Sequence, residues 1–179
     1  MNRRSLIQRA SGALLLAAAG AVIAPPAQAT VPGARRISFV NTHTGDTFAD
    51  AYWESGNYVP DALQAINHVM RDHRSGETHA IDPRLLDQLH QLNGLVEASA
   101  PFQIISGYRS PTTNAMLHDQ SSGVATRSLH MDGRAIDIRI RGVELAHLRD
   151  AALGMQAGGV GFYPSSDFIH VDTGRVRRW

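Results

Sequence analysis

The segment SLHMDGRAIDIRI, residues 128–140, passes from a loop into a strand. Its second half alternates apolar and polar residues strictly, as a strand with one buried face does. Gly133 allows the chain to turn back before the strand, and Asp137 then points away from the face of its two isoleucine neighbours. Because an aspartate in such surroundings needs a partner, the segment indicates a metal ligand on a core strand.

The remaining segments predict strands and helices in an irregular order. Strands are expected at 36–41, 47–53, 102–105, 161–163 and 168–172, the first two forming a hairpin. Helices are expected from Pro60, from Pro83 behind an Asp82 cap, after Ser110, and over 144–155 with an end at Gly158-Gly159. Since no regular strand-helix repeat is visible, the pattern predicts an α+β domain with a central antiparallel sheet flanked by helices.

Three residues are candidates for one metal site on this sheet and an adjoining loop. His130 lies in the loop, Asp137 on the strand that follows it, and His170 on a late strand, where it faces away from its aliphatic neighbours. Hydrolytic zinc uses three protein ligands and leaves one position for water. For His170 considered alone, a hydrogen bond to a backbone carbonyl is the alternative. The chain has no cysteine, which excludes thiolate ligands, a cysteine nucleophile and disulfides.

The N-terminus has the pattern of an export signal. A basic start is followed by an apolar run and then by Ala27-Gln28-Ala29, which predicts a signal peptide over 1–29, a linker over 30–35 and a single domain over 36–179. Arg3-Arg4 favours the twin-arginine route to the periplasm over an ordinary secretion signal. The apolar run is shorter than the ~20 residues of a bilayer-spanning helix, so no permanent membrane span is expected.

Charge argues against a nucleic-acid partner. The chain has 17 basic and 16 acidic residues, and loss of the leader arginines would leave the domain slightly acidic. Binding to a phosphate backbone needs clustered positive charge, and none is visible. The oligomeric state stays open.

Several motifs resemble one family of enzymes. The S-x-H-x-x-G-x-A-x-D pattern of 128–137, the SGYR of 106–109 and the late His170 resemble the zinc peptidases that include D-Ala-D-Ala dipeptidases and carboxypeptidases. The stretches QIISGYRS, AGGVGFYP and FIHVDTGRVRRW are similar to the murein endopeptidase K group within it, over nearly the whole chain.

The resemblance implies one Zn²⁺ ion held by His130, Asp137 and His170. It also implies hydrolysis of the peptide cross-links between peptidoglycan stem peptides, joining either D-alanine to meso-diaminopimelate or two diaminopimelate residues, during remodelling of the cell wall. The alternatives are a carboxypeptidase or dipeptidase that trims stem peptides, and a non-catalytic module that binds the wall.

Catalytic roles also follow from the resemblance. Arg109 matches an arginine that stabilises the tetrahedral oxyanion, with a structural salt bridge as the alternative. Asp167, three residues before His170, has the register of the general base, although it could equally be an exposed turn residue. Asp172, or a second water molecule, could take the proton instead.

Two smaller expectations concern the surroundings of the site. Ser128 is expected to orient the loop of His130 through a hydrogen bond. Tyr108, Tyr163 and Trp179 could line a substrate groove, although aromatic residues near a sheet edge more often pack in the core.

Overall fold

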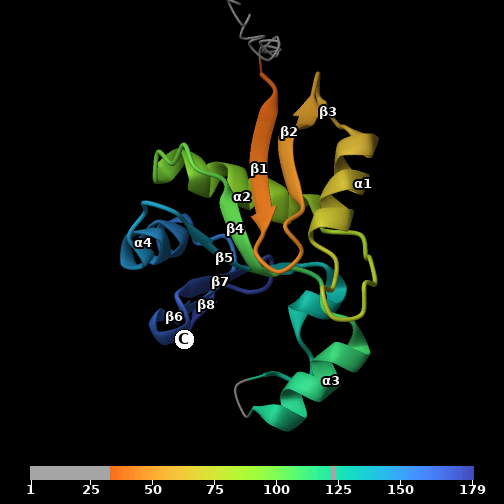
Figure 1. Ribbon diagram of the computed structural model, residues 1–179. Coiled ribbons are helices and arrows are strands. Elements are labelled where there is room, and N and C mark those ends of the chain that lie inside the picture. Colours follow the sequence, from red (N-terminus) through yellow and green to blue (C-terminus); the bar gives the residue numbers. More distant parts are fainter. Residues whose placement is uncertain (1–32, 122–123) are drawn as a thin grey trace, which may run out of the picture.

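The computed structural model describes residues 33–121 and 124–179 (Figure 1). The strands are β1 Arg35–Asn41, β2 Thr47–Glu54, β3 Asn57–Tyr58, β4 Phe102–Ser106, β5 Ala135–Ile140, β6 Gly159–Tyr163, β7 Phe168–Asp172 and β8 Arg177–Arg178. The helices are α1 Pro60–Val69, α2 Pro83–Leu95, α3 Pro111–Gln120 and α4 Leu145–Met155, with short 3-10 turns η1 Leu129–Asp132 and η2 Pro164–Ser166. The predicted signal peptide lies outside the described residues, as do residues 30–32 of the predicted linker.

The strands form one sheet in the order β3-β2-β1-β4-β5-β7-β6-β8. The α+β class is thereby confirmed. The expectation of an antiparallel sheet holds for most neighbouring strands but is wrong for two pairs, β1 with β4 and β6 with β8, which are parallel. A parallel pair needs a long connection between its strands. Between β1 and β4 the chain supplies one, because β2, β3, α1 and α2 intervene.

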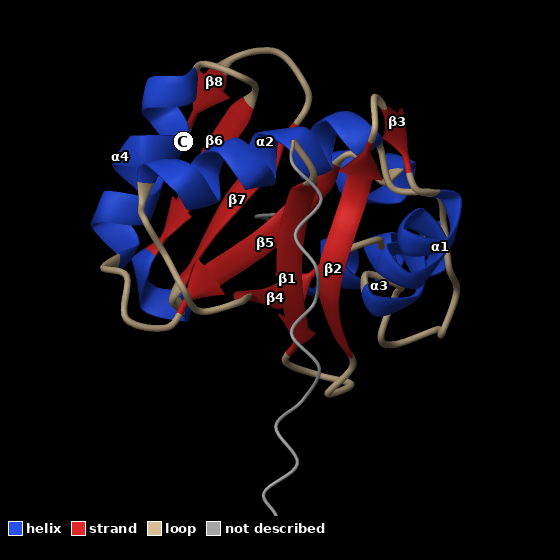
Figure 2. Ribbon diagram, turned by 90° about the horizontal axis from the view of Figure 1, so that it is seen from above, coloured by secondary structure: helices blue, strands red, loops and turns tan. Residues whose placement is uncertain are grey.

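Helices α2 and α4 cover one face of the sheet (Figure 2). The apolar stripe of α2 packs there, with Leu85, Leu86, Leu89 and Leu92 fully buried. Burial of each contributes about 1.5–3 kcal/mol. Leu95, the last residue of α2, is 52% exposed at a surface groove between α2 and α4. The covered face leaves the opposite face of β5 and β7 free to carry polar side chains.

Local signals account for the starts of two helices. The Asp82 carboxylate accepts a hydrogen bond from Arg84 N at 3.0 Å at the start of α2. Ser110 Oγ accepts one from Thr113 N at 3.2 Å at the start of α3. Both caps were predicted from the residue types that satisfy free amide groups at a helix N-terminus.

The end of α4 differs from its prediction. The helix ends at Met155, and Gln156 takes the left-handed conformation with a φ of 49° that Gly158-Gly159 were expected to provide. The glycines have another use. A Cβ atom at Gly158 would overlap the carbonyl oxygen of Asp172, and one at Gly159 would lie 2.6 Å from an Asp172 carboxylate oxygen. They allow β6 to lie close to a residue beside the metal site.

No helix within 33–121 or 124–179 is long and apolar enough to cross a membrane.

Candidate metal centre

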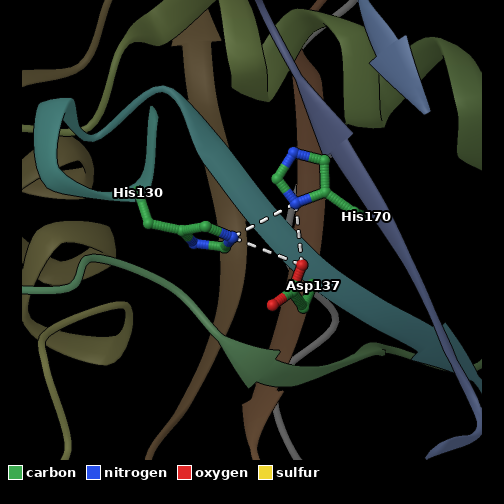
Figure 3. Close-up of side chains that lie close together, drawn as sticks. All are labelled: His130, Asp137 and His170. Carbon is green, nitrogen blue, oxygen red and sulfur yellow. Dashed lines mark hydrogen bonds and ion pairs between the residues drawn. The ribbon is translucent and has the colours of Figure 1, made fainter. Parts of the chain in front are cut away.

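The three predicted metal ligands converge on one point (Figure 3). His130 lies in η1, while Asp137 on β5 is paired across the sheet with His170 on β7. Asp137 Oδ1 is 2.9 Å from His170 Nδ1 and 3.3 Å from His130 Nε2, and the two nitrogens are 3.2 Å apart. Among the described residues, no other group of histidines and carboxylates could hold a metal ion.

Each imidazole uses its other nitrogen to donate a hydrogen bond away from this point. His130 Nδ1 lies 2.7 Å from the carbonyl oxygen of Gly107, which can only accept. His170 Nε2 lies 2.9 Å from Asp172 Oδ2. With those nitrogens protonated, His130 Nε2 and His170 Nδ1 present lone pairs to Asp137 Oδ1. Three acceptor atoms at such distances repel one another, so the arrangement suits a cation at their centre.

The charge of the site supports the same conclusion. Burial alone would raise the pKa of Asp137, but the two neighbouring imidazoles hold that pKa well below its ordinary value. Burial lowers the pKa of His170, and the carboxylates of Asp137 and Asp172 outweigh this and raise it. The side chains of all three ligands are buried, so an ionised carboxylate here needs a positive partner.

The loop that carries His130 is held by close backbone contacts. Gly133 has a φ of 64°, and a Cβ atom there would overlap the carbonyl oxygen of Ala80. Ser128 Oγ accepts a hydrogen bond from His130 N at 3.4 Å, which agrees with its expected orienting role. Arg109 N donates to the His130 carbonyl at 3.2 Å. The sharp turn predicted at Gly133 therefore places His130 above β5.

Asp172 orients His170 and does not face the cleft as a free base. Its carboxylate accepts hydrogen bonds from Gly159 N at 3.0 Å and Gly174 N at 2.8 Å, and from the Arg177 guanidinium at 3.0 and 2.7 Å. The residue is fully buried. Burial would raise its pKa, but these donors and His170 hold it low. All its lone pairs are engaged, which contradicts the alternative that Asp172 is the general base.

Asp167 lies on an exposed turn and is engaged elsewhere. It has a left-handed φ of 54°, and its carboxylate forms an ion pair with Arg139 at 2.8 Å. Its side chain is 65% exposed, and it is not among the residues that line the cleft beside the metal ligands. The geometry therefore agrees with the turn-residue alternative and does not place Asp167 at the reacting atoms.

Arg109 does lie beside the ligands. Its Nη2 is 3.7 Å from Asp137 Oδ2, and its hydrogen bonds to Ser106 Oγ and Asn114 Oδ1 are long, at 3.4 and 3.5 Å. Its buried Nε has no hydrogen-bond partner within the described ranges. Burial lowers the pKa of Arg109 and the Asp137 carboxylate opposes this. A guanidinium with so few close partners keeps donors for a substrate oxygen, although the contact with Asp137 is also a structural ion pair.

A cleft of about 410 Å³ opens over the three ligands. Tyr163, Phe168 and Trp179 line one side of it, so two of the three aromatic residues singled out from the sequence do border a groove. Tyr108 does not, because it is buried and stacked on His79. Sequence reasoning missed Arg127 and Arg177 in the lining. No periodic pattern could have identified them, since they come from a loop and from the edge strand β8.

Comparison with known proteins bears on what such a cleft does. The family model described as peptidoglycan L,D-endopeptidase MepK, of peptidase family M15, matches residues 29–179. The chain belongs to this family. Its members share a dependence on metal, which agrees with the cluster of His130, Asp137 and His170.

Curated relatives of the MepK family match the chain over most of its length. The peptidoglycan L,D-endopeptidase MepK of Escherichia coli K12 is 44% identical over 180 residues, covering 99% of this chain and 97% of the relative. The probable peptidoglycan L,D-endopeptidase MepK of Haemophilus influenzae is 40% identical over 154 residues, covering 86% and 83%. This chain is therefore a peptidase of that family, and the expected murein endopeptidase resemblance is confirmed.

Proposed function

We propose that this protein is a zinc-dependent endopeptidase that hydrolyses peptide cross-links of peptidoglycan. A single Zn²⁺ would be held by His130 Nε2, Asp137 Oδ1 and His170 Nδ1. The observation that carries the proposal is the convergence of these three acceptor atoms at the base of a cleft, with both outer imidazole nitrogens already engaged by Gly107 and Asp172. Two nitrogens and one oxygen, with space for water, suit hydrolytic zinc.

The chemistry divides between the ion and the protein. When bound, zinc polarises a carbonyl and lowers the pKa of water towards ~7. Arg109 lies at the edge of the ligand cluster, where its guanidinium would donate hydrogen bonds to the oxyanion. Asp137 has the one carboxylate side chain among the described cleft residues, and Asp167 is paired with Arg139. The proton of the attacking water would therefore pass through a second water to the leaving amine rather than directly to Asp167.

The name L,D-endopeptidase, printed for the relatives, guides the choice between the two cross-links. It describes a bond whose carbonyl belongs to an L centre and whose nitrogen belongs to a D centre. A link between two diaminopimelate residues has this stereochemistry, whereas a link from D-alanine to diaminopimelate has its carbonyl on a D residue. The diaminopimelate link is therefore our proposed substrate.

The location follows from the substrate. Peptidoglycan lies outside the cytoplasmic membrane, which fits the signal peptide inferred over 1–29, the twin-arginine pair Arg3-Arg4 and a periplasmic domain over 36–179. Replacing Arg3-Arg4 with Lys-Lys should retain the full-length precursor in the cytoplasm if the twin-arginine route is used. Cell fractionation followed by immunoblotting measures this.

Digestion of purified cross-linked muropeptide dimers tests the function. The mature protein should convert diaminopimelate-linked dimers to monomers, read by mass spectrometry, and should act much more slowly on dimers linked through D-alanine. Release of free D-alanine from monomers, with dimers intact, would instead indicate a carboxypeptidase. A chelator should stop the reaction and added zinc should restore it.

His170→Ala separates catalysis from binding. The variant should lose hydrolysis because it lacks one ligand and the hydrogen bond to Asp172. The wall-binding alternative would be supported instead if the wild-type protein cleaves no dimer and the variant still sediments with sacculi.

A further inference from the structure

The C-terminal residue folds back onto the metal centre. The Trp179 indole lies with its ring centroid 5.1 Å from that of His170, and its Nε1 donates a hydrogen bond to Tyr163 Oη at 2.7 Å. Both Trp179 and Tyr163 line the cleft. Neither side chain has a role in the zinc chemistry proposed above.

Backbone contacts hold Trp179 in this place. Phe162 N donates to the main-chain oxygen of Trp179 at 3.1 Å, and Trp179 N donates to the Val160 carbonyl at 3.3 Å. A Cβ atom at Gly161 would lie 2.7 Å from the indole, so the absence of a side chain there makes room for the ring. The Arg177 guanidinium lies 4.8 Å from the centre of the same ring. The indole is therefore packed on several sides.

The Tyr163 ring is held on the same face of the sheet as the metal ligands. On β6, Phe162 contacts Arg149 of α4, so its neighbours along the strand point to the opposite face, where the cleft lies. Tyr163 is paired with Phe168 on β7, and their rings stack at 4.6 Å with an angle of 22° between planes. The phenol is thereby directed into the cleft by the sheet register and by aromatic packing.

The hydrogen bond from Trp179 determines what the phenol can do. An indole N–H is a donor only, so Tyr163 Oη must accept in this contact. The O–H of the phenol is not used in this contact, and no hydrogen bond from it to an acceptor is found within 33–121 or 124–179. Arg109, whose guanidinium carries further N–H donors, borders the same cleft. Two donors thus face one space above the ligands.

We propose that Tyr163 is a further catalytic residue, whose hydroxyl donates a hydrogen bond to the oxyanion formed from the scissile carbonyl. Trp179 is its positioning residue, because it occupies a phenol lone pair and so leaves the hydroxyl proton free for the substrate. Arg109 would donate from the side of Asp137, and Tyr163 from the side of His170. This inference rests on the proposed function and assigns the cleft a second hydrogen-bond donor for the transition state.

Tyr163→Phe tests the inference because it removes one hydroxyl and keeps the ring that stacks on Phe168. Loss of one donor to an oxyanion costs on the order of 10²-fold in kcat or more. We expect a fall of at least about tenfold in kcat with KM changed less than about threefold. Zinc content and the melting temperature should equal those of the wild type. Tyr58→Phe is the matched control, since that hydroxyl bonds Asp87 far from the cleft.

A second readout does not depend on turnover. A phosphinate analogue of the diaminopimelate link mimics the tetrahedral oxyanion, so its Kd should rise in Tyr163→Phe by about the factor lost from kcat/KM. Trp179→Phe, which keeps an aromatic ring without the indole N–H, should lower kcat by a smaller factor.

Three results would overturn the inference. The first is a metal-loaded Tyr163→Phe variant whose kcat equals that of the wild type. The second is a variant with a raised KM and an unchanged kcat, and the third is a variant that binds the phosphinate as tightly as the wild type. Failure of the wild-type protein to cleave any cross-link would refute the proposed function itself, and is read separately in the unsubstituted enzyme.

Discussion

Each imidazole of the candidate metal site is oriented by one residue behind it. For His170 that residue is Asp172, whose carboxylate is fully buried and is also bonded to Arg177. For His130 it is the Gly107 carbonyl, which no side-chain substitution removes. Asp172 is therefore the residue at which the tautomer and basicity of a ligand can be altered without touching the ligand.

Asp172→Asn should lower zinc affinity about 10- to 100-fold, the usual cost of losing an outer partner of a histidine ligand. The amide oxygen can still accept from His170, but the negative charge that raises the basicity of the ring is lost. Competition with a chromophoric chelator measures the affinity. Asp150→Asn is the control, because this exposed carboxylate pairs with Arg149, away from the candidate metal site. Equal affinity in the two variants would contradict the role given to Asp172.

Gly133→Ala should destabilise the fold by about 1–3 kcal/mol and weaken metal binding. The new methyl group would overlap the Ala80 carbonyl, and relief of that contact would move the loop of His130. Gly142→Ala is the control, because it introduces the same backbone strain without the steric overlap. Gly142 has a φ of 84° but nothing within 4 Å of the position that a Cβ atom would take. Urea unfolding should find the larger loss at Gly133, and only that variant should lose zinc affinity.

At the scale of elements, the loop between α1 and α2 supports the cleft from outside the sheet. Asp72 in this loop is buried, and its carboxylate accepts from Ser110 N at 2.9 Å, next to Arg109. The neighbouring His73 stacks on His43 with ring centroids 3.8 Å apart. The loop therefore links the stacked pair of His73 and His43 to the segment that carries Arg109.

The His73 pair makes stability depend on pH. Burial, together with the charge of His43, lowers the pKa of His73 to about 4. The unfolded chain, with a pKa near 6.5, binds this proton first, so stability is present above pH ~6.5 and is lost as pH falls towards 4. The loss should be about 1 kcal/mol, allowing for solvent screening of a partly exposed ring.

His73→Gln should flatten this part of the profile, measured as melting temperature at pH 4.5, 5.5 and 7. His147→Gln, at the groove between α2 and α4, is the comparison variant and should keep the wild-type slope. A His73→Gln protein with an unchanged slope would show that other groups carry the pH dependence.

At the scale of the whole molecule, the metal site joins segments far apart in the chain. His130 and His170 are 40 residues apart and come from a loop and a strand that meet only in the folded state. A ligand that binds only the folded protein stabilises it by mass action, by about 2.7 kcal/mol at a free concentration 100 times its Kd.

Metal removal should therefore lower the melting temperature by about 5–10 °C for a domain of this size. Differential scanning calorimetry of chelator-treated and zinc-restored protein checks this. Added zinc or cobalt should restore the melting temperature, because either cation removes the repulsion among the three acceptor atoms. In His170→Ala, which lacks one acceptor, added metal should give little increase.

Local patterns in the sequence determined most elements and the ligand set. Strict alternation in RAIDIRI marked β5 with Asp137 opposite the core, and the caps Asp82 and Ser110 marked two helix starts. These signals are local because side-chain alternation and capping depend on neighbours a few residues away. Naming His170 as third ligand needed the family resemblance as well, since a single histidine on a strand has many roles.

Only the tertiary structure decided the partners across the sheet. It paired Asp167 with Arg139, engaged Asp172 behind His170, and placed Trp179 over that ring. It also made two strand pairs parallel. Such contacts depend on strand register and on where distant segments pack, which no short window of sequence contains. The candidate ligands could therefore be predicted from residue type and spacing together with the family resemblance, whereas the surroundings that orient those side chains arise from long-range pairing.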